Sequence, residues 1–230
     1  MRLGNSFALA ALLCSTAASA AFAHGNTVSV RRTGEQVVVG SGRFVTDARN
    51  LPSFTRIVSE DATDVEVRIG SGTSVELEAD DNLVGKIGTS VENGTLLISS
   101  TGSYSTTRAP KIRITMPSLS EVDLRGSSDA RISGLGGGTL DFTSIGSGDL
   151  SAEGRLDRVE IRLQGSGDVD LTRLGAGEVD IVVNGSGDAN VGSPRSLTAT
   201  VNGSGSVSYD GEPRILRQTV NGTGHIGKSR

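Results

Sequence analysis

Large aromatic side chains and cysteines are nearly absent from this sequence. Its 230 residues contain no Trp, only 3% aromatic residues and a single cysteine, Cys14. After residue 14, therefore, neither a disulfide nor a thiolate metal site can form. Hydrophobic residues make up only 35% of the chain, which is low for a globular protein. Any core has to be thin and built from Val, Ile, Leu and Ala.

An excess of positive charge is also lacking, since 22 Lys and Arg residues stand against 26 Asp and Glu residues and the formal net charge is −4. A mildly acidic chain lacks the basic surface that nucleic acids require, so a nucleic-acid partner is not expected. No apolar stretch is long enough to cross a membrane. The two histidines, His24 and His225, lie near opposite ends of residues 24–230. This separation argues against a histidine-based active site.

The first residues have the pattern of a secretory signal. Arg2 provides the positive start, a short apolar run follows at 7–14, and the small-residue stretch STAASAAFA offers cleavage after Ala20 or Ala23. A lipid anchor on Cys14 is less favoured because Leu13 stands where such signals need a small residue. The sequence thus predicts a signal peptide at 1–23 and export to the periplasm, cell surface or medium.

A repeat dominates the second half of the chain. A glycine recurs every 18 to 20 residues and is followed by SSD, SGD, SGD, SGD, SGS and TGH; these glycines are Gly126, Gly146, Gly165, Gly185, Gly203 and Gly222. Apolar residues alternate with polar ones before and after each glycine, as in the row Ile161, Ile181 and Ala199. Alternation with period two is typical of strands with one buried face.

A unit of about 19 residues cannot close a core by itself, but stacked units can. We therefore predict an all-β, parallel solenoid whose coils of about 19–20 residues lie about 4.8 Å apart. The glycines would form the corners, and Asn184, Asn202 and Asn221 would stack just before them. Less regular alternation extends this body towards the N-terminus. We expect a leader or cap at 24–50 and the solenoid at 51–230.

A family resemblance supports this interpretation. The segment from FTRIVSEDATDVEV to NGTLLIS, then MPSLSEVDLRGSSDARI and the serial GSGDVDL-like units, resembles the bacterial head GIN domain family, which is labelled "putative auto-transporter adhesin". The resemblance covers about residues 42–230. It implies a right-handed β-helix, an exported protein and an adhesin-like role. No membrane β-barrel pattern follows the repeats in this sequence, so we do not expect the protein to translocate itself through an outer membrane.

One column of carboxylates is the sharpest candidate site, and it consists of Asp129, Asp149, Asp168 and Asp188. Stacked carboxylates repel each other, so burying them would demand a cation such as calcium, which takes six to eight oxygen ligands. The period of about 19 and the missing Gly-Gly-x-Gly-x-Asp spacing argue against a calcium repeat. We expect solvated turn residues and no cofactor, with calcium as the alternative.

The sequence favours a non-enzymatic interaction module that presents a repetitive polar surface to an envelope protein or glycan. A carbohydrate-active enzyme is the other alternative, because outward acidic and basic residues coexist, as in Glu160 with Arg162 and Asp157 with Arg158. Sugar-stacking aromatics are scarce, however, and charge alternation on an exposed face explains these pairs as well. The open strand edge at the end of the repeats allows a homo-oligomer.

Overall fold

The computed structural model describes residues 28–30 and 36–229, and almost all of its regular structure is β-strand. The predicted signal peptide lies outside these residues. Within them, the single helix is the short 3-10 turn η1 (Val84–Lys86). No helix in this described part is long and apolar enough to cross a membrane.

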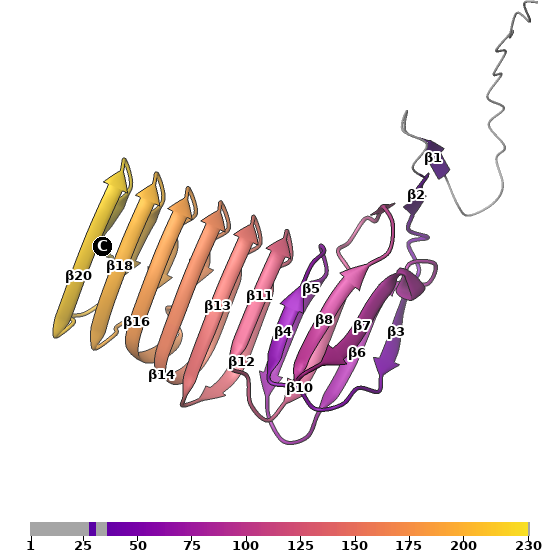
Figure 1. Cartoon of the computed structure of the whole chain (residues 1–230), viewed down its shortest axis with the longest axis horizontal. Coiled ribbons are helices and arrows are strands. Elements are labelled where there is room, and N and C mark those ends of the chain that lie inside the picture. Colours follow the sequence, from indigo (N-terminus) through magenta and orange to yellow (C-terminus); the bar gives the residue numbers. More distant parts are fainter. Residues whose placement is uncertain (1–27, 31–35, 230) are drawn as a thin grey trace, which may run out of the picture.

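The strands build two faces of a flattened solenoid, joined into one sheet of 18 strands (Figure 1). Face A contains, in spatial order, β7 (Ile87–Glu92), β8 (Thr95–Ser100), β4 (Arg56–Ser59), β11 (Glu121–Gly126), β13 (Thr139–Gly146), the later part of β14 (Leu150–Gly165), the later part of β16 (Leu174–Gly185), β18 (Ser196–Gly203) and β20 (Ile215–Gly222).

Face B contains the shorter strands of the repeats. Its spatial order is β3 (Phe44–Arg49), β6 (Ser74–Asp80), β10 (Lys111–Met116), β5 (Asp64–Ile69), β12 (Ala130–Gly136), the start of β14, β15 (Val169–Asp170), β17 (Ala189–Val191), β19 (Ser206–Tyr209) and β21 (His225–Lys228). A separate small sheet contains β1 (Val28–Val30), β2 (Gln36–Val39) and β9 (Tyr104–Ser105).

The predicted parallel β-solenoid is confirmed and makes about five turns. Each coil consists of a long strand on face A, the GSGD-type turn, a short strand on face B and a second turn. Successive long strands pair in parallel with glycine against glycine, from Gly126 with Gly146 to Gly203 with Gly222. The repeat period in the sequence is therefore the length of one coil.

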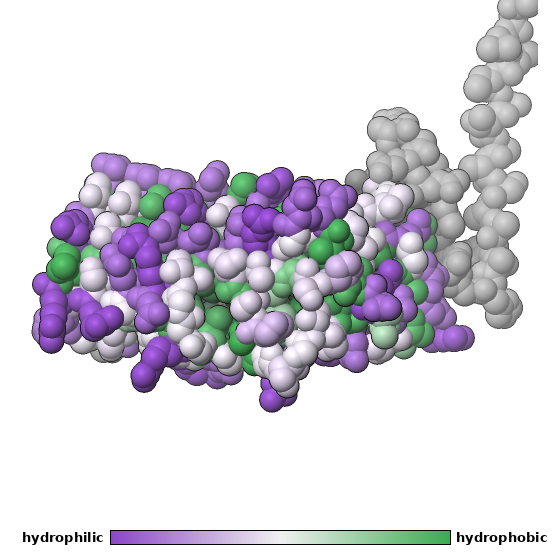
Figure 2. All heavy atoms as spheres, turned by 60° about the horizontal axis from the view of Figure 1, so that its bottom comes forward, coloured by the Kyte–Doolittle hydropathy of each residue, from purple (hydrophilic) through white to green (hydrophobic). Residues whose placement is uncertain are grey.

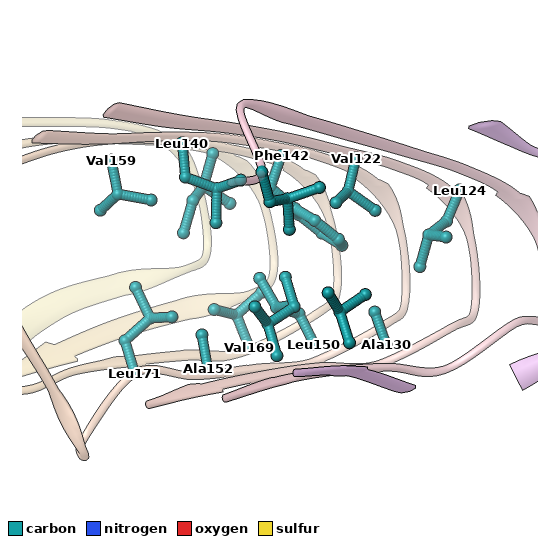
Figure 3. Close-up of a cluster of buried hydrophobic side chains, with 14 of the residues drawn as sticks. Val122, Leu124, Ala130, Leu140, Phe142, Leu150, Ala152, Val159, Val169 and Leu171 are labelled. Carbon is teal, nitrogen blue, oxygen red and sulfur yellow. The ribbon is translucent and has the colours of Figure 1, made fainter. Parts of the chain in front are cut away.

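Aliphatic side chains form continuous inner rows. Ile161 pairs with Ile181 and Ile181 with Ala199, and each of the three is 1% exposed. In Figure 3, residues of face A such as Val122 and Phe142 lie opposite residues of face B such as Leu150 and Val169. Because the two faces are close, medium-sized side chains fill the space between them without large aromatics.

The N-terminal part of the solenoid departs from simple winding. The coil made of β4 and β5 lies between β8–β10 and β11–β12, although β8 and β10 follow it in the sequence. Antiparallel pairs close this end, since β7 pairs with β8, and β6 pairs with both β10 and β3. After β5 the chain thus continues to the N-terminal end of the solenoid, and it comes back past β4 and β5 to begin the regular repeats at β11.

Polar contacts close the N-terminal end over the core. The guanidinium of half-buried Arg49 donates to the carbonyl oxygens of Val84 at 3.0 Å and Ile87 at 3.4 Å. Leu83, just before η1, is fully buried. The carboxylate of buried Asp80 accepts the backbone N–H of Gly42 at 2.6 Å. These contacts bring β3, β6 and the segment around η1 together as a cap.

Candidate functional site: the GSGD edge and the faces beside it

The GSGD corners need both of their glycines, each for a different reason. Gly165, the first glycine of its turn, has φ +140°, and a Cβ there would lie 1.9 Å from the carbonyl oxygen of Gly146 in the preceding coil. Gly167 has no such φ, yet its Cβ would lie 2.1 Å from the carbonyl oxygen of Gly148. The sequence predicted the need for glycine at the first position, where the corner requires a positive φ. It did not predict the need at the second position, where the neighbouring coil leaves no room for a Cβ.

The first repeat shows why the second glycine is needed. Ser128 stands at this position, and its hydroxyl donates to the carbonyl oxygen of Asp61 at 2.6 Å. The coil beneath it ends in the differently shaped turn around Asp61, which leaves space for a side chain. Where one GSGD turn lies on another, the backbones approach too closely for a Cβ.

The aspartate column bonds one coil to the next. The Oδ1 atom of Asp129 accepts the backbone N–H of Asp149 at 3.0 Å. Asp149 accepts the N–H of Asp168, and Asp168 that of Asp188, each at 2.8 Å. Asp188 accepts the N–H of Ser206 at 2.8 Å. A carboxylate that accepts a backbone N–H gains a charge-assisted bond, which offsets the repulsion along the column.

A shallow groove of about 220 Å³ follows this column along face B. It is lined by Asp129, Ala130, Arg131, Asp149, Leu150, Ser151, Asp168, Val169, Asp170 and Asn190. Its floor consists of outward residues of neighbouring strands, because Ser151 pairs with Arg131 on one side and with Asp170 on the other. The groove thus presents carboxylates, a guanidinium, a hydroxyl and an amide at intervals set by the strand spacing.

Local bonds hold the polar floor of the groove in place. Asp170 accepts both the hydroxyl of Thr172 at 2.6 Å and its backbone N–H at 3.0 Å. These bonds lower the pKa of the Asp170 carboxyl, the hydroxyl contributing most. The hydroxyl of Ser208 donates to the amide oxygen of Asn190. The groove is therefore preorganised, and Asp170 stays charged at neutral pH.

Charges on face A are paired with one another. Arg158 donates to Glu160 and to Glu178, each at 3.0 Å, and it also contacts Asp180. Arg162 pairs with Glu160 at 3.1 Å. The bond from Arg158, aided by Arg162, lowers the pKa of the Glu160 carboxyl.

The structure brings together only one of the two acid–base pairs noted in the sequence. Glu160 and Arg162 are in contact. Asp157 and Arg158 are not paired with each other: the Asp157 carboxylate accepts the backbone N–H of Gly138 at 3.0 Å. Arg158 pairs instead with Glu160, Glu178 and Asp180. The predicted asparagine stack is present, since Asn221 donates to Asn202 at 2.8 Å and Asn202 to Asn184 at 2.7 Å.

Metal-type clusters are not found in the described part of the chain. No three His, Cys, Asp or Glu residues there are arranged to hold a metal ion. His225 lies exposed at the end of the turn column, where its backbone N–H donates to Gly205 at 3.2 Å. What the arrangement offers chemically is a set of fixed hydrogen-bonding groups along a groove.

Comparisons with known proteins agree with this architecture. The family described as "Putative auto-transporter adhesin, head GIN domain" matches residues 53–213. No curated protein matches the chain. A crystal structure of a putative adhesin from Bacteroides fragilis is 24% identical, with a TM-score of 0.69, and the match covers 83% of this chain and 99% of that one.

A second solved structure, described as a putative lipid-binding protein from Parabacteroides distasonis, is 22% identical. Its TM-score is 0.52, and the match covers 84% of this chain and 99% of that one. Identities this low establish a shared fold and nothing further. The family match spans most of the chain, and so the chain belongs to the head GIN domain family of proteins described as putative auto-transporter adhesins.

Proposed function

We propose that this protein is an exported, non-enzymatic interaction module that binds a polar partner, an envelope protein or a glycan, at the bacterial surface. The observation that carries this proposal is the preorganised groove beside the aspartate column, with its polar groups repeated from coil to coil. The adhesin-like name of the family supports a role at the surface.

Binding in such a groove would be passive and additive. Each coil along the groove offers one carboxylate of the aspartate column and one outward polar side chain, which is Arg131, Ser151, Asp170 or Asn190. A partner with a repeating polar chain could therefore contact several coils at once. Several weak contacts on one rigid support raise the overall affinity far above that of any one of them. Rigidity helps because little conformational entropy is lost on binding.

Pairing of the face A charges favours this role over hydrolysis of a polysaccharide. A glycosidase needs two carboxylates set on either side of the bond it cleaves, one of them able to hold a proton. Glu160 has its pKa lowered by Arg158, which makes it a poor general acid. We therefore propose that the outward charges stabilise the surface and do not catalyse a reaction.

The test is to measure binding of the purified chain to glycan arrays and to envelope-protein fractions, and then to alter the groove. Ser151→Arg places a long side chain on the groove floor between Arg131 and Asp170. Thr200→Arg is the matched control, because Thr200 also points outward and is half-buried but lies on face A. Binding that Ser151→Arg reduces at least tenfold and Thr200→Arg leaves intact supports the groove; no binding to any of these ligands contradicts the proposal.

We also propose that the aspartate column needs no calcium. One oxygen of each carboxylate already accepts a backbone N–H from the next coil, whereas calcium would require six to eight oxygens. The melting temperature should then be the same with calcium and with an excess of chelator. A lower melting temperature in chelator would show a structural calcium ion.

A further inference from the structure

The last coil leaves the C-terminal end of the core uncovered within the described residues. All eight residues of β20 are exposed. Leu216 and Val220 are 41% and 42% exposed, although Leu197 and Val201, their partners in the preceding coil, are fully buried. Figure 1 places β20 at one extreme of the ladder of strands, and Figure 2 shows hydrophobic surface at that end.

We propose that this end binds a second copy of the chain, so that two solenoids meet end to end through β20. At the opposite end, antiparallel strands and Arg49 cover the core, so that end offers no exposed apolar row to match Leu216 and Val220. Two identical C-terminal ends can meet only around a twofold axis, which gives a closed dimer and not a filament. In that arrangement the two β20 strands run antiparallel.

Gln218 indicates where the axis would pass. It occupies an inner row in which the preceding members, Ile181 and Ala199, are buried and apolar. A glutamine amide carries both donors and an acceptor, so it can pair with the same amide of a second copy. Centring an antiparallel pair on Gln218 places Leu216 opposite Val220 of the second copy, which extends the apolar core across the contact.

Charge in the last coil permits this contact. The same register sets Arg217 opposite Thr219 of the second copy, so the two Arg217 side chains do not face each other. Lys228 is already paired with Glu212. The remaining charged groups of residues 210–228 are Asp210 and Arg214, which leaves the end face nearly neutral.

The size of the end face predicts a weak dimer. Eight strand residues extend about 27 Å, and two faces about 10 Å apart with their side chains are about 20 Å thick, so each copy would bury about 500 Å². The total of about 1,000 Å² lies at the lower limit for specific interfaces. Association should therefore depend on concentration, with a dissociation constant in the micromolar range or weaker.

Sedimentation velocity of the full chain, from micromolar to millimolar concentration, tests this proposal. We expect a monomer–dimer equilibrium that Val220→Lys weakens at least about tenfold, because it places an unpaired charge in the contact. Thr219→Gln is the control, since Thr219 is the neighbouring residue on the same strand and a glutamine there lengthens the side chain without placing a like charge opposite Arg217 of the second copy; it should leave the equilibrium unchanged. Circular dichroism would establish that both variants remain folded.

A cross-linking experiment tests the register. In a Cys14→Ser background, Gln218→Cys should form a dimer-linking disulfide under mild oxidation, while Thr219→Cys should not. A chain that stays monomeric at all concentrations, or a Val220→Lys variant that dimerises as well as the unaltered chain, would overturn the proposal. Binding of a different protein to this end without self-association would overturn it as well.

Discussion

The N-terminal part of the solenoid, residues 44–116, and the repeats, residues 121–228, share the same two faces but are built differently. The N-terminal part uses antiparallel hairpins, a coil out of sequence order and side-chain contacts to carbonyl groups. The repeats use parallel pairing in strict order. One end of the core is therefore covered, and the other is exposed at β20.

This difference shows what a repeat can and cannot do. The backbone N–H and C=O groups of a repeated coil form their hydrogen bonds with the coils on either side of it. The last coil of a repeat therefore has one strand edge without a partner coil. Closing the core needs residues that break the repeat, as Arg49 and the segment around η1 do. The predictions below test this contrast, from the largest expected effect to the smallest.

The largest effect is expected from a glycine in the stacked corners. Gly167→Ala would place a Cβ 2.1 Å from the Gly148 carbonyl oxygen, so neighbouring coils would have to separate. We expect a loss of more than about 4 kcal/mol, or failure to fold. Gly85→Ala in η1 is the control, since its Cβ would meet nothing within 4 Å. Chemical denaturation followed by circular dichroism measures both, and equal stabilities would refute the close-approach argument.

A matched pair of leucines compares the middle of the repeats with their open end. Leu197 is fully buried and Leu216, the next residue in the same row, is 41% exposed. Leu197→Ala should cost about 3 kcal/mol, because it leaves a cavity. Leu216→Ala should cost less than about 1 kcal/mol in dilute, monomeric protein. Similar losses for the two would mean that the end coil is covered in solution.

A matched pair of arginines compares the closed end with the open one. Arg49→Ala removes the donors to the carbonyl oxygens of Val84 and Ile87 and should cost about 1–2 kcal/mol. Arg217→Ala, on the exposed strand β20, should change the free energy of unfolding by no more than about 0.5 kcal/mol. Thermal melting of both variants decides this, and an unaffected Arg49→Ala variant would show that the cap does not depend on that side chain.

The smallest effect concerns Asp64, at the junction of the two parts. Burial raises the pKa of its carboxyl above the ordinary value of 3.8, although the bond from the Asp129 N–H opposes this. A raised pKa in the folded state means that Asp64 favours folding most below pH 3.8, and that this contribution is lost as the pH rises through the folded-state pKa.

Asp64→Asn removes this pH dependence while keeping an oxygen that can accept the Asp129 N–H. The variant should therefore be slightly more stable than the unaltered chain at pH 7, by less than about 1 kcal/mol, and the difference should shrink towards pH 3. Unfolding measured across this pH range tests the sign. A difference that does not change with pH would mean that burial of the carboxyl is not its cause.

Much of the repeat region could be predicted from the sequence, because its periodicity records the coil length directly. The glycine register, the inner rows and the asparagine stack follow from aligning residues 18 to 20 apart. The position of the β4–β5 coil could not be predicted in this way. Its strands look like those of any other coil, and only long-range pairing places them between β8–β10 and β11–β12.

The candidate site was predictable in its members but not in its bonding. The column of Asp129, Asp149, Asp168 and Asp188 is visible in the sequence. That each carboxylate accepts an N–H from the following coil, and not from its own turn, depends on how closely two corners approach. The groove beside the column likewise exists only once Arg131, Ser151 and Asp170 lie side by side.

By itself, the sequence determined the period, the faces of the strands and the thin aliphatic interior, because these depend on residues close together in the chain and on one repeated spacing. Tertiary structure alone decided which coil lies next to which at the N-terminal end, why both corner glycines are needed, and which end of the core is exposed. Each of these depends on contacts between residues far apart in the sequence, where local periodicity carries no information about which surfaces meet.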